Sequence, residues 1–170
     1  MSVSAYMLSL LVRQHLFLGD QFEKRYPSSW LVWEPGPWRP ARTTAEGDSK
    51  ATMAADSLPA RPAGSDALCF ELRNNATRVT LGRSSESEIF INDLTLSREH
   101  LVLENQGGWS LTVAPSSSTA TQFEGATLAP GTKKPLLPNA RIKAGDVHLS
   151  FYNTAGMLAR LREEATRGPR

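Results

Sequence analysis

The chain has 170 residues, of which 19 are basic and 17 acidic, so its formal net charge is +2. This length suits one domain of about 100 to 150 residues with an extension. The near balance of charge excludes binding to nucleic acid through the overall field, and any anion site must be local. Cys69 is the only cysteine. It excludes an intrachain disulfide and a cysteine-based metal site, and it fits a reducing, cytoplasmic compartment.

An apolar run occupies residues 3–18, VSAYMLSLLVRQHLFL. No basic region precedes it and no small-residue cleavage site follows it, which argues against a secretion signal. It is also shorter than the roughly 20 apolar residues that span a bilayer, so we do not expect membrane insertion. Its periodicity predicts a helix that ends near Lys24-Arg25, before Pro27. We expect this helix to pack on the rest of the chain; the alternatives for its apolar face are self-association, a partner protein or a membrane surface.

Three of the four tryptophans lie in residues 28–38, SSWLVWEPGPW. The apolar residues 30–33 predict a short strand, and the Pro-Gly-Pro at 35–37 predicts a turn. Two interpretations stay open, a hydrophobic cluster under the helix or an aromatic docking patch. We treat residues 1–38 as an N-terminal helical and Trp-rich extension.

Residues 39–66 are rich in Ala, Thr, Pro, Ser and Gly and contain no aromatic residue. So few apolar groups cannot offset the entropy of ordering the segment, and the composition predicts a flexible linker.

Short alternating segments follow the linker. They predict strands at 67–74, 78–83, 88–93, 100–105, 109–114 and 148–153. Several short strands with turn residues between them are typical of an all-β sandwich or barrel. Helical periodicity returns only in MLARLREEATR, which predicts a short C-terminal helix and tail over 154–170. The β-domain is therefore expected over 67–153.

Polar residues gather where these strands end. The set comprises Gly82, Arg83, Ser97, Arg98, His100, Gly145 and Asp146. Their order within LGRSSESEIFINDLTLSREHLVLE and IKAGDVHLSF resembles the forkhead-associated (FHA) domain. The resemblance implies a mainly β fold, an FHA-type β-sandwich of about eleven strands, with loops at one end that bind phosphothreonine peptides. It implies no metal and no cofactor.

The resemblance also assigns roles. Arg83 matches the phosphate-binding arginine of the family and Ser97 its phosphate-binding serine, with Arg98 adding charge beside them. A phosphothreonine carries about −1.5 to −2 charges and three acceptor oxygens, so its site needs fixed donors and ideally a two-pronged arginine. Gly82 is expected to let the backbone turn so that Arg83 points into the loops, and His100 to brace those loops.

One departure stands out. Members of the family normally carry Ser-x-Asn-Gly-Thr after the hairpin, and the Asn holds the peptide backbone. Here the stretch is SSSTATQFEG, so Thr119 stands in place of the Asn and is the candidate peptide-binding residue at this position. One hydroxyl cannot make the paired contacts of an amide, which would cost about 1 to 3 kcal/mol of binding.

Two functions remain open. The first is a phosphothreonine-binding adaptor in Ser/Thr kinase signalling, whose partner is a phosphorylated protein, either a kinase or its substrate. The second is a phosphate-independent scaffold that holds its partner through the Trp-rich segment or the first helix. A narrower hypothesis has phosphorylated Thr43 or Thr44 of the linker docking on the domain itself, as in small bacterial FHA proteins.

An enzyme is not expected. The three histidines, His15, His100 and His148, share no metal-ligand spacing, and no phosphate-cradling glycine loop or nucleophile elbow is present. Ser97, His100 and Asp93 lie too close along the chain to adopt the geometry of a catalytic triad.

Overall fold

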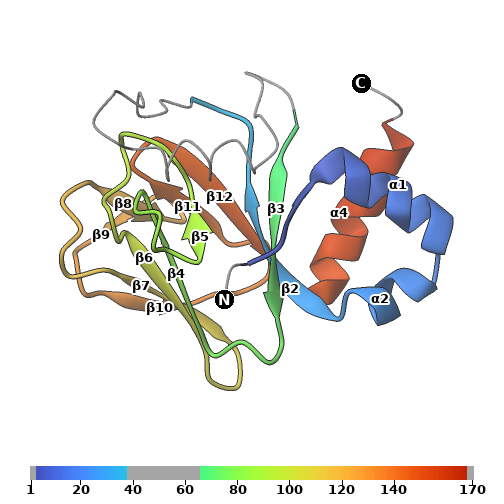
Figure 1. Cartoon of the computed structure of the whole chain (residues 1–170), viewed down its shortest axis with the longest axis horizontal. Coiled ribbons are helices and arrows are strands. Elements are labelled where there is room, and N and C mark those ends of the chain that lie inside the picture. The colour runs from blue at the N-terminus through green and yellow to red at the C-terminus, as the bar shows by residue number, and fades with distance from the viewer. Residues whose placement is uncertain (1–2, 38–65, 168–170) are drawn as a thin grey trace.

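The computed structural model describes residues 3–37 and 66–167. They form two β-sheets and a group of helices beside the larger sheet (Figure 1). The larger sheet runs in the order β1 (Ala5–Met7), β3 (Leu68–Arg73), β2 (Ser28–Trp33), β12 (Val147–Tyr152), β11 (Arg141–Ala144), β8 (Thr121–Phe123) and β9 (Ala126–Leu128). The smaller runs β10 (Lys133–Pro135), β7 (Trp109–Val113), β6 (Leu101–Asn105), β4 (Arg78–Gly82) and β5 (Ile89–Phe90). The predicted mainly β sandwich is confirmed.

Helices α1 (Leu8–Leu18), α2 (Gln21–Arg25) and α4 (Thr154–Thr166) lie outside the two sheets. The C-terminal helix is as predicted. The N-terminal run differs from the prediction, because residues 5–7 pair with β3 as an edge strand before the helix starts. Gly19, with φ +55°, then separates α1 from α2. Within the described ranges, no helix has the length and apolar character needed to cross a bilayer.

The Trp-rich strand β2 is an internal strand of the larger sheet. It is hydrogen-bonded between β3 and β12, with Trp30 opposite Glu71 and Tyr152. Trp30 is fully buried and Trp33 is 3% exposed. The structure therefore favours packing over the aromatic docking patch for these two side chains. It also places a strand that the sequence assigns to the extension inside the β-sandwich.

Two hydrophobic cores lie on opposite faces of the larger sheet. Side chains alternate along a strand, so Leu31 and Trp33 join the core between the sheets while Trp30 and Val32 join the core under the helices. The helix-side core also contains Leu11, Phe22, Tyr26, Cys69, Met157 and Leu161. A strand buried on both faces reads as a continuous apolar run, which explains the sequence WLVW.

Most of the predicted linker 39–66, including Thr43 and Thr44, lies outside the described residues. Its last residue, Asp66, is placed, and its carboxylate caps helix α1. The Ser9 backbone N–H lies 3.2 Å from each carboxylate oxygen, and the Ser9 hydroxyl donates to the same group. A carboxylate at this point satisfies a free N–H of the first turn and favours the helix dipole.

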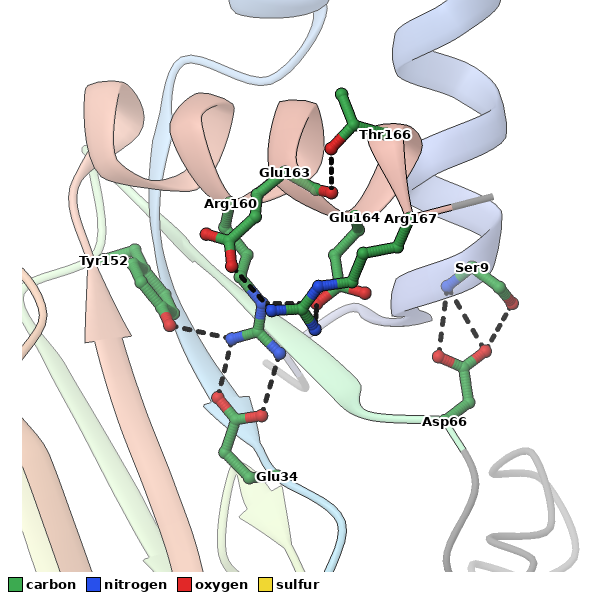
Figure 2. A network of polar contacts seen from close by, with 9 residues as sticks. All are labelled: Ser9, Glu34, Asp66, Tyr152, Arg160, Glu163, Glu164, Thr166 and Arg167. Carbon is green, nitrogen blue, oxygen red and sulfur yellow. Dashed lines mark hydrogen bonds and ion pairs between the residues drawn. The ribbon is translucent and has the colours of Figure 1, made fainter. Parts of the chain in front are cut away.

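Helix α4 is held against the sheet by a partly buried arginine (Figure 2). Arg160 donates from Nη1 and Nη2 to the two oxygens of Glu34, at 2.8 and 3.0 Å. Nη1 also donates to the Tyr152 hydroxyl at 2.7 Å, and Nε donates to Glu164 at 3.0 Å. Glu34 directly follows β2, so the network joins the C-terminal helix to the strand that precedes the linker.

The network sets the charge state of its two main partners. Burial by itself raises the pKa of Glu34, but the hydrogen bond and the charge of Arg160 outweigh it and leave that pKa below its usual value. The hydrogen bond to Glu34 likewise raises the pKa of Arg160. Both groups are therefore charged at neutral pH, and the charge of each is stabilised by its opposite partner.

We expect Arg160→Met to destabilise the fold by about 3 to 5 kcal/mol at pH 7, because it leaves the Glu34 carboxylate partly buried without its cation. Denaturant unfolding measures the change. Arg167→Met is the matched control, because Arg167 is 50% exposed and its ion pairs should contribute less than about 1 kcal/mol.

The pH dependence follows from the lowered pKa of Glu34. In the wild type its stabilisation is complete above about pH 4.5 and is lost as the pH falls through the lower folded-state pKa. In Arg160→Met the main group that lowers the pKa of Glu34 is gone and burial raises that pKa, so the penalty should shrink as acid protonates Glu34. A penalty that is independent of pH, or equal to that of Arg167→Met, would contradict the role given to this pair.

Candidate functional site

Three loops and one turn meet at one end of the sandwich. The loops are 83–88 after β4, 91–100 between β5 and β6, and 114–120 between β7 and β8. The Arg83 N–H donates to the Ser97 carbonyl at 2.9 Å, and the Ala114 N–H donates to the His100 carbonyl at 2.9 Å. The turn at Gly145 joins them, since its N–H donates to the Ala120 carbonyl at 2.9 Å. The sequence-predicted site residues of the strand ends therefore lie together.

Gly82 permits a close approach of two of these loops. A Cβ atom at this position would lie 2.0 Å from the Arg98 carbonyl oxygen, so any larger residue would push the backbones apart. From the sequence we expect Gly82 to let the backbone turn so that Arg83 points into the loops; its φ is not positive, so a left-handed turn is not the reason for the glycine. The glycine is needed for space, because β4 and the 97–100 segment pack backbone against backbone.

His100 lies fully buried behind the loops and links them. Its Nδ1 accepts from the Ser97 N–H at 3.0 Å, and its Nε2 lies 2.8 Å from the Thr121 hydroxyl. Burial lowers the pKa of His100 to about 4, so the ring is neutral at physiological pH. Since Nδ1 accepts from a backbone N–H, the ring proton resides on Nε2 and is donated to Thr121. This agrees with the bracing role implied for His100.

Ser97 carries a hydroxyl at the centre of the site. The side chain is 8% exposed, and its Oγ accepts from the Ser118 N–H at 2.9 Å. The Oγ atoms of Ser117 and Ser118 and the Oγ1 atom of Thr119 lie 3.3, 3.5 and 3.3 Å from it. The loop that carries SSST therefore folds directly over Ser97 and surrounds it with hydroxyl groups.

Thr119 is turned into this cluster. Its hydroxyl lies 3.3 Å from Nδ1 of His100 as well as 3.3 Å from the Ser97 hydroxyl. A group engaged with two interior partners is poorly placed to hold a peptide backbone. The sequence makes Thr119 a candidate for peptide binding, and in the structure its hydroxyl lies against the loop residues Ser97 and His100.

Arg83 is half-buried at the edge of the cluster. Its Nε donates to the Leu96 carbonyl at 3.0 Å, which fixes the guanidinium beside the Ser97 loop. In the described part of the chain, no residue is hydrogen-bonded to its two terminal nitrogens. They are thus available to an anion, in the fork geometry that suits a phosphate.

Arg98 is exposed beside Ser97. Its carbonyl oxygen accepts from the Ser84 N–H at 3.0 Å, so its backbone is fixed by the loop that follows Arg83. Two arginines and one serine hydroxyl therefore lie on two loops that are bonded to each other.

Thr95 supports the site although no motif in the sequence singles it out. Its hydroxyl donates to Asp93 at 2.6 Å and accepts from the Asp146 N–H at 2.8 Å, which ties the 91–100 loop to the Gly145 turn. A Cβ on Gly145, whose φ is +56°, would lie 2.3 Å from the Thr95 carbonyl oxygen. The Asp-x-Thr spacing is a signal for such a turn, because an Asp side chain commonly bonds the backbone two residues ahead.

The family model of the FHA domain matches residues 79–145. The chain contains an FHA domain. The solution structure of the FHA domain of an Arabidopsis thaliana hypothetical protein is 21% identical, with a TM-score of 0.51, and the match covers 75% of this chain and 86% of that one. This likeness shows the fold.

Two further FHA structures resemble this chain. The FhaA FHA domain, crystallised with the intracellular domain of Rv3910, is 20% identical with a TM-score of 0.43, covering 49% of this chain and 86% of its own. The MEK1 FHA domain, in complex with a HOP1 phosphothreonine peptide, is 16% identical with a TM-score of 0.43, covering 50% and 87%. No curated protein matches the chain in sequence.

The buried neutral His100 predicts how the stability of this FHA domain depends on pH. Its folded-state pKa of about 4 lies below the value of about 6.5 for an exposed histidine, so the unfolded chain takes up a proton first as the pH falls. Between pH 7 and pH 5 this should cost about 2 kcal/mol of unfolding free energy. The contribution is complete above pH 6.5 and is lost towards pH 4.

Denaturant unfolding of the wild type, His100→Gln and His148→Gln at pH 7 and pH 5 checks this. His100→Gln should remove the acid-sensitive component, while His148→Gln, at an exposed position, should keep it. Equal pH dependence in all three proteins would show that His100 is not buried and neutral as described.

Proposed function

We propose that this FHA domain binds phosphothreonine in partner proteins, with Arg83, Ser97 and Arg98 contacting the phosphate. The observation that carries the proposal is the way in which the Arg83 guanidinium is held. Its Nε is anchored on the Leu96 carbonyl, and its terminal nitrogens are left beside the Ser97 loop. An arginine held in this way is pre-organised, so little entropy is lost when an anion binds.

The strength of such a site can be estimated. A hydrogen bond to a charged group contributes about 1.5 to 3 kcal/mol, and a micromolar complex requires about 8 kcal/mol. Two or three bonds from Arg83, Ser97 and Arg98 would supply much of this. The inward orientation of Thr119 means that the peptide backbone adds little near the phosphate, so binding should depend strongly on phosphorylation itself.

Dependence on phosphothreonine makes the domain an adaptor in Ser/Thr kinase signalling. Its partner would be a kinase with a phosphorylated segment or the substrate of one. Cys69 is a buried free thiol, and burial raises its pKa well above the usual value, so it is unreactive. A location in the reducing cytoplasm is part of the proposal, and it rests on the presence of a single cysteine, which forms no intrachain disulfide.

The phosphate-independent scaffold retains one supporting observation. The buried Trp30 and Trp33 are not available for docking, but Leu16 and Phe17 of helix α1 are 66% and 88% exposed. An exposed pair of this kind is a small contact surface through which a partner or a second copy could bind. The same binding experiment separates the two functions, because this surface has no reason to distinguish a phosphorylated ligand.

The test uses a pool of threonine peptides with randomised flanking positions, prepared with and without phosphate. We expect the wild type to bind the phosphorylated pool at least tenfold more tightly, measured by fluorescence anisotropy. Arg83→Ala should abolish most of that preference, because it removes the fixed guanidinium and costs about 10- to 150-fold.

Arg78→Ala is the matched control, since Arg78 is an exposed arginine at the other end of the same strand β4. It should bind like the wild type. Equal binding of both pools by the wild-type protein would reject the phosphothreonine function and leave the scaffold.

A further inference from the structure

The outer face of strands β11 and β12 carries a row of basic side chains that the helices leave open. We propose that this basic strip, made of Arg141, Lys143 and His148, binds an acidic segment of the phosphorylated partner. The inference rests on the proposed function, because it extends the contact with that partner beyond the phosphate. It assigns a second binding surface, on the larger sheet, to the same protein ligand.

Alternation along β11 places two cations on the outer face of the sheet. Ile142 and Ala144 belong to the core between the sheets. Successive side chains of a strand point to opposite faces, so Arg141 and Lys143 lie on the outer face. The helix-side core takes side chains from β2, β3 and β12 but, within the described residues, none from β11. Arg141 is accordingly exposed and Lys143 half-buried.

Lys143 has side chains with N–H groups on both sides. In the pairing of β11 it stands opposite His148 of β12 and Gln122 of β8, and residues directly opposite on one face have Cβ atoms about 4.5 to 5.5 Å apart. The Pro-Gly-Pro turn at 35–37 passes close by, since a Cβ on Gly36 would lie 3.2 Å from Cδ2 of His148. These side chains and the turn line a hollow of about 390 Å³ on the sheet.

The positive charge of the strip is open to a ligand. In the described parts of the chain, neither the Arg141 nor the Lys143 side chain forms an ion pair. Glu34, the acidic residue that lines the hollow, accepts from Arg160 through both of its oxygens, and the charge of Arg141 acts on it less strongly. Glu124 accepts from the backbone N–H of Arg141 at 3.2 Å. Neighbouring cations repel each other, so an anionic ligand between them is favoured.

Strand β11 connects the strip to the loop end of the sandwich. Directly after the strand, the Gly145 N–H donates to the Ala120 carbonyl of the loop 114–120. At about 3.3 Å per residue, Lys143 lies about 7 Å and Arg141 about 13 Å from Gly145 along the strand. A partner held by its phosphothreonine at the loops can therefore reach the strip with residues a few positions away.

An acidic protein segment fits the strip better than a nucleic acid does. None of the described residues that line the hollow is aromatic, whereas surfaces that bind single strands offer aromatic rings on which bases stack. The net charge of the whole chain is only +2, which gives little general attraction for a polyanion. Carboxylates on an extended segment need only a few local donors, and these are what the strip provides.

The experiment compares two phosphothreonine peptides with a tail of six residues, all Glu in one and all Gln in the other. The tail is placed before the phosphothreonine in one pair and after it in a second pair, and each peptide has an unphosphorylated twin. Six extended residues span about 20 Å, enough to cover the strip. In one of the two pairs, full-length wild type should bind the Glu peptide about fivefold more tightly than the Gln peptide by fluorescence anisotropy, because two exposed ion pairs form.

The double variant Arg141→Gln with Lys143→Gln should reduce this Glu-to-Gln preference to within about twofold. Lys133→Gln with Lys134→Gln is the matched control, because it removes the same charge from exposed positions on β10 of the smaller sheet. It should keep the preference of the wild type. Thermal unfolding checks that both double variants are folded.

Equal Glu-to-Gln preferences in the two double variants would overturn the inference while the phosphate preference of the wild type stands. A single-stranded oligonucleotide that displaces the Glu peptide from the wild type but binds the Arg141→Gln, Lys143→Gln protein weakly would assign the strip to nucleic acid and overturn it as well. A wild type that binds each phosphorylated peptide and its twin equally would instead remove the proposed function, and this inference with it.

Discussion

The buried imidazole of His100 is the contact on which the loop end of the sandwich depends. It accepts from the backbone of Ser97 and donates to Thr121, so it joins the loop after β5 to the start of β8. Burial keeps it neutral, and a neutral ring can act as acceptor and donor at once. The hydroxyl of Ser97 and the loop that covers it are positioned by this arrangement, and Gly82 provides the space for the end of β4 to pack against the backbone of Arg98.

The sandwich of this chain is completed by its termini. Strand β2, from the N-terminal part, is buried on both faces, because the smaller sheet covers one face and helices α1, α2 and α4 cover the other (Figure 1). Arg160 of α4 is bonded to Glu34, the residue after β2. Ser9 of α1 is bonded to Asp66, which lies just before β3. Glu34 and Asp66 are therefore each bonded to a helix. The helices belong to the folding unit, since they bury Trp30, Val32 and Cys69.

Alternating apolar residues made strands β3, β4, β6, β7 and β12 predictable, and the ordered Gly-Arg and Ser-Arg-x-His motifs led to Arg83, Ser97 and His100. The sequence did not reveal that β2 pairs with β3, because that partnership joins residues on either side of a long segment of different composition. The three- and four-residue strands β8 to β11 were missed, since so few residues show no periodicity. The direction of the Thr119 and Ser118 hydroxyls could not be predicted from the sequence, because it depends on contacts with Ser97 and His100 that form only in the folded loops.

The most direct test of the account is a ¹⁵N-resolved NMR titration of the full chain with a short phosphothreonine peptide and its unphosphorylated twin. The account predicts that only the phosphorylated peptide shifts amide signals, and that the largest shifts fall on Arg83, Ser97 and Arg98, at the loop end of the sandwich. Shifts centred on Leu16 and Phe17 of α1, or equal shifts with both peptides, would contradict it.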